Sequence, residues 1–381
     1  MEAPFDRRVT CILWHPTNAR LLAVASHGGD ILLYSYENDI STICLMKGCG
    51  AGGSIQSMKF DPQNSTQLYT ASMEGKFLVM NFETKEQKEF LNTNDYNRWY
   101  ISVDVNPINN LMVVGDTKGG LTILTLDGHV VDTVQLHKKG FKISHAEFSK
   151  RETWLLSTSS TDGTLKLWDI RHLKPDKNGK IHSLQVINHE KPLNAAYFSL
   201  TDGCRLLTTD QKDKIMIYRA PLWNLETTIH HPHRQFQHLT PIRAHWHPNE
   251  DIVFVGRYPC KTFPGYHENE LRTIDFFDGL TGKLLYQHCQ KDVNGIMSLN
   301  RFNSNGDALA SSYGARFLIW KPDFRNLDVT EQRRSKKRKS SEESQYSDNA
   351  EVRNNNQSDA NWSIVFKDKV KNKRQEKKKK V

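Results

Sequence analysis

Short apolar runs alternate with polar turns from the N-terminus to about Trp320, and a three-run unit recurs. Each unit has an alternating run ending in an aromatic residue or Val, a polar turn often carrying Pro or Gly, a second apolar run, a short turn and a third run. Period-two alternation in short runs bounded by turn residues is typical of β-strands. The units lie at residues 13–36, 59–82, 104–126, 147–170, 197–218, 245–259 and 301–320.

The spacing of these units predicts a β-propeller. The anchors that close each first run recur at nearly even intervals, at Trp14, Phe60, Val105, Phe148, Phe198, Trp246 and Phe302. A repeat of this length with three or four short strands is typical of propeller blades, and the segment TDGTLKLWDIR (161–171) matches the WD-repeat consensus. We therefore predict an all-β, seven-bladed WD-repeat β-propeller with blade-packing roles for Trp14, Phe60, Phe148, Trp246 and Trp320.

The composition changes after about Thr330. Residues 331–381 hold 16 Lys+Arg and 8 Asp+Glu, which leaves 36 and 35 for residues 1–330, so nearly all of the net charge of +9 belongs to the tail. The runs RRSKKRK and KNKRQEKKKK are too polar to bury a core, and they suit nuclear localisation or non-specific phosphate binding. A merely solvating tail is the alternative. We predict a propeller over residues 1–325, a disordered basic tail over 326–381, and a nuclear protein.

The cysteine pattern and the N-terminus bound the compartment. The six cysteines are scattered, without a C-x-x-C motif or a Cys/His zinc spacing, which favours a reducing environment. The sequence has neither the basic-then-apolar start of a signal peptide nor an apolar stretch long enough to span a bilayer. We expect a soluble intracellular protein without a cofactor.

Closure of the ring is a question that the repeats leave open. Propellers usually close through an N-terminal segment that supplies the outer strand of the last blade, since an unpaired edge strand is a liability. Only MEAPFDRR precedes the first predicted strand at Val9. Either residues 321–329 (KPDFRNLDV) complete the last blade, or the ring closes poorly, or a further segment precedes Met1.

Topology assigns the loops to two faces. The strands a to d of a blade run antiparallel outward from the axis, so the d-to-a and b-to-c connections share one face, here called the d-to-a face. This face collects Arg7, Arg8, Arg98, Lys138, Lys139, Lys142, Lys212, Arg234, Arg257, Lys261 and Arg272, with aromatic Trp99, Phe236 and Tyr258 between them. Cations with exposed aromatic rings suit nucleic acid, because the charges bind phosphates and the rings stack on bases. Polar loops without a ligand are the alternative.

One d-to-a connection, residues 230–241 (HHPHRQFQHLTP), stands out. Phe236 lies between Gln235 and Gln237 with no apolar periodicity that would place it in a core, so we expect it to face solvent. The histidines of the segment raise the alternative of a metal site or an enzyme at His230, His231, His233 and His238. The segment has no carboxylate or Cys to accompany them, and we predict neither a metal nor catalysis.

The chain resembles the small-subunit family of the UV-damaged DNA-binding protein complex, the xeroderma pigmentosum group E proteins. The resemblance covers nearly all of residues 3–320, and its histidine-rich stretch and LLTTDQK are not general WD-repeat features. The motifs that carry it are APFDRRVTCILWHPT (3–17), GAGGSIQSMKF (50–60), NAAYFS (194–199), LLTTDQK (206–212), HPHRQFQHLTPI (231–242), VGRYP (255–259) and LRTIDFFDG (271–279).

The resemblance implies a damage sensor without enzymatic activity that inserts a hairpin into double-stranded DNA from the minor groove. The implied hairpin is Phe236, Gln237 and His238. The implied pocket for extruded lesion bases is Trp99, Gln211, Tyr258 and Arg272, and the implied phosphate contacts are Arg7, Arg8, Lys142 and Arg234. Docking onto the large damage-binding subunit, the adaptor of a cullin–RING ubiquitin ligase, is implied for the WDIR segment at Trp168, Asp169 and Arg171.

The sequence departs from the family pattern in two places. The family carries a helical segment before the propeller that grips the adaptor, whereas this chain starts almost at blade one, and His27 stands where a basic residue is common. The rival interpretation is a protein-interaction or histone-reading receptor of a ubiquitin ligase that binds peptides at the axial pore and does not recognise lesions. Nucleosomes and histones are further expected partners.

Overall fold

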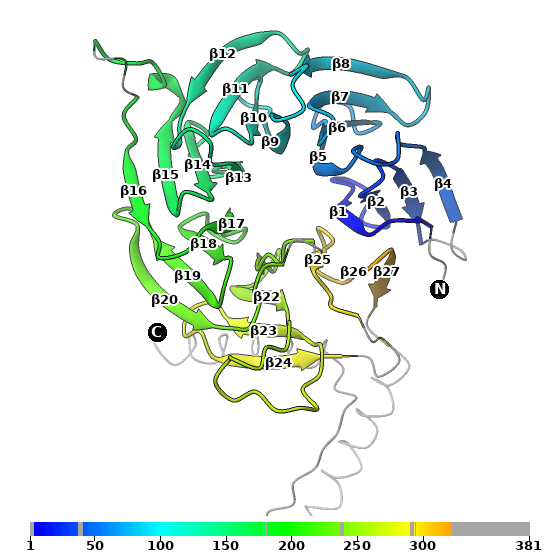
Figure 1. Cartoon of the computed structure of the whole chain (residues 1–381), viewed down its shortest axis with the longest axis vertical. Helices are drawn as coiled ribbons and strands as arrows, with labels where there is room; N and C mark the ends of the chain where they lie inside the picture. Colours follow the sequence, from blue (N-terminus) through cyan, green and yellow to red (C-terminus); the bar gives the residue numbers. More distant parts are fainter. Residues whose placement is uncertain are drawn as a thin grey trace, which may run out of the picture. The chain divides into compact units, whose positions relative to one another are not determined.

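Seven antiparallel sheets stand around a central axis in the computed structural model, which confirms the predicted all-β, seven-bladed propeller (Figure 1). The structure describes residues 4–36, 41–177, 179, 181–236, 240–289, 293 and 295–321. Six of the sheets have four strands in sequence order, and the seventh has three within the described residues. The predicted boundary near residue 325 and the tail 326–381 lie outside the described residues.

The first four blades contain sixteen strands and one short 3-10 helix, η1 (Ile170–His172). Blades one and two are β1 (Val9–Trp14), β2 (Leu21–Ser26), β3 (Ile31–Ser35), β4 (Ser41–Met46), β5 (Ile55–Phe60), β6 (Gln67–Ser72), β7 (Lys76–Asn81) and β8 (Gln87–Asn92). Blades three and four are β9 (Tyr100–Asn106), β10 (Leu111–Asp116), β11 (Gly120–Thr125), β12 (Val130–Gln135), β13 (Ile143–Phe148), β14 (Leu155–Ser160), β15 (Thr164–Asp169) and β16 (Gln185–Asn188).

The last three blades follow the same order. Blades five and six are β17 (Leu193–Phe198), β18 (Arg205–Asp210), β19 (Lys214–Arg219), β20 (Asn224–His230), β21 (His245–Trp246), β22 (Ile252–Gly256), β23 (Ile274–Asp278) and β24 (Leu284–His288). Blade seven is β25 (Leu299–Phe302), β26 (Leu309–Tyr313) and β27 (Arg316–Trp320).

Apolar clusters fill the spaces between neighbouring blades. The second strand of most blades is buried on both faces, because each sheet packs against two neighbours. The predicted packing role is confirmed for four anchors, which are 4–7% exposed: Trp14, Phe60, Phe148 and Trp246. Trp320, at the end of β27, is half-buried.

Packing between blades seven and one closes the ring, whereas a poorly closed ring was one of the alternatives that the sequence left open. One cluster joins Phe5, Val9 and Trp14 of the first blade to Leu299 and Ala310 of the seventh. The Trp14 Nε1–H donates to the Arg301 carbonyl at 2.8 Å, and the backbone N–H of Val9 donates to the Gly314 carbonyl at 2.8 Å. Completion of blade seven by residues 321–329 stays a prediction, because residues after 321 lie outside the described part.

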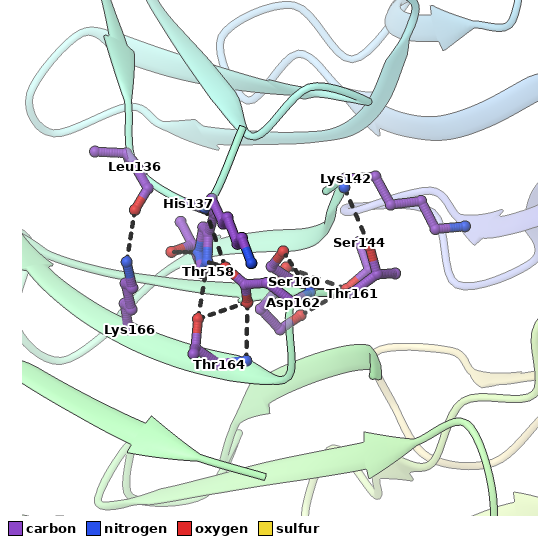
Figure 2. A network of polar contacts seen from close by, with 12 residues as sticks. Leu136, His137, Lys142, Ser144, Thr158, Ser160, Thr161, Asp162, Thr164 and Lys166 are labelled. Atoms are coloured by element: carbon purple, nitrogen blue, oxygen red, sulfur yellow. Dashed lines mark hydrogen bonds and ion pairs between the residues drawn. The ribbon is translucent and has the colours of Figure 1, made fainter. Parts of the chain in front are cut away.

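A buried chain of hydrogen bonds fixes blade four to the connection that precedes it (Figure 2). The Trp168 Nε1–H donates to Thr158 Oγ1 at 2.8 Å, and Thr158 Oγ1 lies 2.8 Å from His137 Nε2. His137 Nδ1 lies 3.1 Å from the Asp162 carboxylate. Burial lowers the pKa of His137, so the ring is neutral and takes the tautomer that donates from Nδ1 to Asp162 and accepts at Nε2 from Thr158.

We expect Thr158→Val to lower the free energy of unfolding by about 2–3 kcal/mol, because Trp168 and His137 would each lose a buried partner while the side-chain volume stays the same. Urea unfolding followed by tryptophan fluorescence measures the change. The matched control is Thr228→Val on the exposed surface of β20, for which we expect a change within about 0.5 kcal/mol. Equal stabilities of the two variants would contradict the assigned role of this hydrogen-bond chain.

Candidate nucleic-acid interface

Backbone hydrogen bonds join the d-to-a connections to the b-to-c turns, which places both on one face as the topology predicts. The His27 N–H donates to the Arg8 carbonyl at 2.8 Å, and the Thr117 N–H donates to the Trp99 carbonyl at 3.0 Å. The Thr161 N–H donates to the Lys142 carbonyl at 3.1 Å. The loops of the d-to-a face are therefore held to each other and not only to the strands that they follow.

The connection that carries Phe236 is anchored by two fully buried histidines. The rings of His231 and His233 stack with their centroids 5.5 Å apart. His231 Nε2 lies 3.5 Å from the Asp275 carboxylate of blade six, and His233 Nε2 lies 3.3 Å from the Asp210 carboxylate of blade five. These two histidines thus pack as anchors between the loop and two blades.

Two further backbone bonds hold the same loop. The Gln235 N–H donates to the Gln211 carbonyl at 3.0 Å, and the Tyr258 N–H donates to the Pro232 carbonyl at 2.9 Å. Residues 232–235 therefore lie between the b-to-c turns of blades five and six. Gln237 and His238, the other two residues of the predicted hairpin, lie outside the described residues.

Phe236 is half-buried, whereas the sequence pattern predicted a solvent-facing ring. Its ring centroid lies 4.9 Å from that of Tyr258 at an interplanar angle of 37°, and the Arg234 guanidinium lies 5.6 Å from its centroid. Contacts of this kind contribute about 0.5–1.5 kcal/mol each, which is small enough for a stacked base to replace them. Phe236 lies at the surface in contact with a second aromatic ring and a cation.

The residues implied for the lesion pocket lie on three blades. Gln211 and Tyr258 border the Phe236 loop from blades five and six, and Arg272 is an exposed residue directly before Thr273, whose carbonyl accepts from the Arg257 N–H. Trp99 is half-buried on blade three, where its backbone bonds to Thr117. The structure thus places Gln211 and Tyr258 beside the Phe236 loop, Arg272 on the same blade as Tyr258, and Trp99 on a separate blade of the same face.

The cations of the d-to-a face fall into two groups. Arg98 and Arg257, which the sequence pattern counted among the phosphate-binding cations, pair with buried carboxylates: Arg98 with Asp116 at 2.8 Å, and Arg257 with Asp275 at 2.9 Å and with Glu270. Their charges stabilise the turns. Within the described residues, Arg7, Lys142 and Arg234 make no ion pair and remain available for an anion. Arg8, half-buried, lies beside them.

These cations act on one another electrostatically. Burial, followed by Arg8 and Arg7, lowers the pKa of His27, and burial together with Arg243 lowers the pKa of Lys142. Burial also lowers the pKa of Arg8. Unfavourable like-charge contacts of this kind are relieved by a bound anion. Figure 2 shows the Lys142 side chain extending away from the buried hydrogen-bond chain of blade four.

Arg243 is a member of this surface that the sequence reasoning missed. It precedes β21 and lies next to the axis with Arg8 and His27. The signal that could have found it is its position in the run IRAHW, where period-two alternation puts Arg243, His245 and His247 on the same side of the inner strand.

The WDIR segment lies at the opposite face, where β15 ends. Trp168 is 2% exposed within blade four, so its side chain supports the segment from inside. The Asp169 carboxylate accepts from Arg171 Nε at 2.9 Å and from Arg171 Nη2 at 2.7 Å, and these bonds lower the pKa of Asp169. The Arg171 guanidinium also stacks over Trp154 at 5.0 Å, while its side chain stays 59% exposed. Arg171 is thus the exposed member of the segment.

Two features are absent from the part of the chain that the structure describes. It contains no group of three or more His, Cys, Asp or Glu side chains placed to hold a metal ion. Among the same residues there is also no helix with the length and apolar character needed to cross a membrane.

Comparisons with known proteins agree with this arrangement. A family model, WD domain, G-beta repeat, matches residues 120–169. DNA damage-binding protein 2 of Gallus gallus is 46% identical over 326 residues, covering 84% of this chain and 63% of that protein. The Bos taurus protein of the same name is 46% identical over 323 residues, covering 84% and 74%, and that of Oryza sativa subsp. japonica is 31% identical over 352 residues, covering 88% and 58%.

The sheet order and the repeat match define a WD-repeat β-propeller protein. Within that class the identity to the Bos taurus protein, over 74% of its length, shows the family. The chain belongs to the DNA damage-binding protein 2 family, and the predicted resemblance is confirmed. The chain spans 63% of the length of the Gallus gallus relative.

The buried loop anchor His231 makes stability depend on pH. Burial, opposed by Asp275, lowers its pKa to about 4, whereas a histidine of the unfolded chain titrates at about 6.5. Between these values the unfolded state binds more protons, so the free energy of unfolding falls as pH drops from about 6.5 toward 4, by up to about 1.4 kcal/mol per pH unit for this group. We expect His231→Gln to flatten the measured profile by that amount.

Urea unfolding at several pH values between 7.5 and 4.5 measures this slope. The matched control is His129→Gln, whose side chain is 83% exposed, and which should leave the slope unchanged. Parallel profiles for His231→Gln and the parent chain would show that His231 is protonated equally in both states and would contradict its role as a neutral anchor.

Proposed function

We propose that this chain is a non-enzymatic recognition subunit for UV-damaged double-stranded DNA. The observation that carries the proposal is the loop at residues 231–236, which is anchored to two blades and bears an aromatic ring at a surface whose described cations include several without an ion pair. Membership of a family whose relatives are named DNA damage-binding protein 2 supports damaged DNA as the ligand.

In the proposed mechanism, Phe236 leaves its contact with Tyr258 and enters the base stack, with Gln237 and His238 facing the orphaned bases. Unstacking a base step costs about a few kcal/mol. A photodimer is already poorly stacked and paired, so extruding it costs less free energy than extruding the bases of intact DNA. Selectivity then comes from the deformability of the duplex. Tyr258, Gln211, Arg272 and Trp99 would receive the extruded lesion, while Arg7, Arg8, Lys142 and Arg234 bind phosphates.

The proposal extends to a second partner on the opposite face. Arg171, positioned by Asp169 and Trp154, would dock onto the large damage-binding subunit, the adaptor of a cullin–RING ubiquitin ligase. The chain would then act as the substrate receptor of that ligase in nucleotide excision repair in the nucleus, with lesion-bearing nucleosomes as its substrate. The two partners would bind to opposite faces, so both can be bound together.

The triple variant Phe236→Ala, Gln237→Ala, His238→Ala tests the lesion-binding role. We expect the ratio of the affinities for UV-irradiated and intact duplex to fall toward one, because the wedge is lost. Salt-sensitive binding to both duplexes should remain. A competition gel shift with irradiated and intact duplex, at several salt concentrations, measures both quantities.

Far-UV circular dichroism controls for folding of the triple variant. If the variant still prefers irradiated duplex, the hairpin mechanism is wrong. If the parent chain shows no preference and instead captures unmodified nucleosomes, the rival function, a histone-reading receptor without lesion recognition, replaces the proposal.

Arg171→Ala tests docking on the opposite face. We expect at least about a tenfold loss of affinity for the purified large damage-binding subunit, since an interfacial arginine that pairs on both sides contributes about 2 kcal/mol. The matched control is Arg219→Ala on blade five, which is also 59% exposed and pairs with a carboxylate, Glu226, at 2.9 Å. Biolayer interferometry measures both, and equal affinities for the two variants would remove Arg171 from the interface.

A further inference from the structure

A small polar pocket opens near the axis of the ring on the d-to-a face. It encloses about 420 Å³, counting its open mouth. Blades one and two contribute His27 and Gln56, and the chain that enters blades one and six contributes Arg8, Thr240 and Arg243. Thr240 and Pro241 form one wall of the pocket, and they follow Phe236 along the chain by only a few residues.

The lining of the pocket is positively charged. It includes two arginines and a histidine and no carboxylate. Arg243 forms no hydrogen bond or ion pair with any described residue, although its Nε is buried, and the buried Nδ1 of His27 also lacks a partner among them. By contrast, Arg98, Arg205 and Arg257 all pair with acidic side chains. Arg243 is half-buried, and a buried guanidinium N–H without a partner is costly, so this arrangement favours an anionic ligand.

The backbone that carries Arg243 is held on both sides. The Ile242 carbonyl accepts from Asn194 Nδ2 at 3.1 Å, and the Ala244 N–H donates to Thr209 Oγ1 at 3.0 Å. Thr240 Oγ1 donates to the Val9 carbonyl at 2.7 Å, which joins this wall to blade one. The pocket is therefore preorganised and does not require a loop to close around a ligand.

Two β-bulges supply the polar groups of the facing wall. The registers of β1 with β2 and of β5 with β6 both shift at the second residue of the inner strand. The extra residues are Thr10 and Gln56, and both line the pocket. Bulges redirect side chains in this way, and here they place a hydroxyl and an amide opposite Arg243.

We propose that this pocket binds a single phosphate group of the DNA backbone next to the point where Phe236 enters the duplex. The inference rests on the proposed function. A backbone phosphate is favoured over an acidic peptide because two more cations without an acidic partner among the described residues act electrostatically on the lining, Arg7 on His27 and Lys142 with Arg243. In addition, one wall continues directly from the inserting segment. A guanidinium matches two phosphate oxygens, and the Gln56 amide has a second N–H besides the one that donates to Ser54 Oγ at 2.8 Å.

The salt dependence of DNA binding tests this site. We expect Arg243→Gln to weaken binding of irradiated and intact duplex alike by about tenfold, and to reduce the slope of log K against log salt by about one, because one phosphate contact is lost. Fluorescence anisotropy with both duplexes between about 50 and 300 mM KCl, a range over which screening changes strongly, measures affinity and slope together.

The ratio of the affinities for irradiated and intact duplex separates this inference from the proposed function. Loss of the pocket should leave this affinity ratio unchanged. Loss of the hairpin should bring the affinity ratio toward one and leave the slope of log K against log salt unchanged. The matched control is Lys88→Gln on outer strand β8, which should alter neither. Arg243→Lys retains the charge and should retain the slope, which guards against misfolding of the glutamine variant.

Three outcomes would overturn the inference. An unchanged slope for Arg243→Gln means that the pocket binds no DNA phosphate. Binding of a fluorescent hexaglutamate peptide that Arg243→Gln abolishes, with unchanged DNA affinity, assigns the pocket to an acidic peptide. Stabilisation of the parent chain by inorganic phosphate that Arg243→Gln removes, again with unchanged DNA affinity, assigns it to a free anion.

Discussion

An aspartate at the b-to-c turn is the interaction on which the d-to-a face depends. Asp116 and Asp210 end the second strands of blades three and five, and Asp162 lies in the b-to-c turn of blade four. Each accepts a backbone N–H group of its own turn. Asp116 also accepts from Arg98, Asp162 lies 3.1 Å from His137 Nδ1, and Asp210 lies 3.3 Å from His233 Nε2, all three on d-to-a connections. A buried carboxylate needs several donors to stay ionised. The same carboxylate that closes the turn therefore attaches the neighbouring loop to the blade.

This attachment explains why histidines are frequent in the loops of a surface that is rich in arginines and lysines. A buried imidazole with a lowered pKa can donate to a carboxylate without bringing a charge into the core, as His137 does toward Asp162. His231 in the loop of Phe236 is also buried with a lowered pKa, and its Nε2 lies 3.5 Å from the Asp275 carboxylate. Histidine anchors leave the surface cations next to them, such as Lys138 and Arg234, without a competing acid among the described residues. The positive charge of the d-to-a face and the attachment of its loops are thus supplied by different residues.

The sequence predicted the ring well, because blade architecture depends on a local signal repeated seven times. Period-two alternation located the strands, and the anchor residues Phe60, Phe148 and Trp246 pack as expected. The roles of the loop cations could not be derived in the same way. Whether Arg98 binds phosphate or pairs with Asp116 depends on a turn that is distant along the chain. Arg243 was missed because it lies in a strand-like run, and its exposure to the axis arises only when the ring closes.

The half-buried state of Phe236 bears on how such a surface could discriminate between duplexes. A ring that packs on Tyr258 in the absence of DNA has to give up about 1 kcal/mol of contact before it enters a base stack. Intact DNA adds its own stacking energy to that cost, whereas a distorted step adds less. The contact with Tyr258 therefore adds the same free-energy cost of insertion on every DNA sequence, and insertion is favourable only at segments that open easily. In the proposed mechanism, the cations of this face attract any duplex without reducing the discrimination, because attraction and insertion are separate terms in the binding free energy.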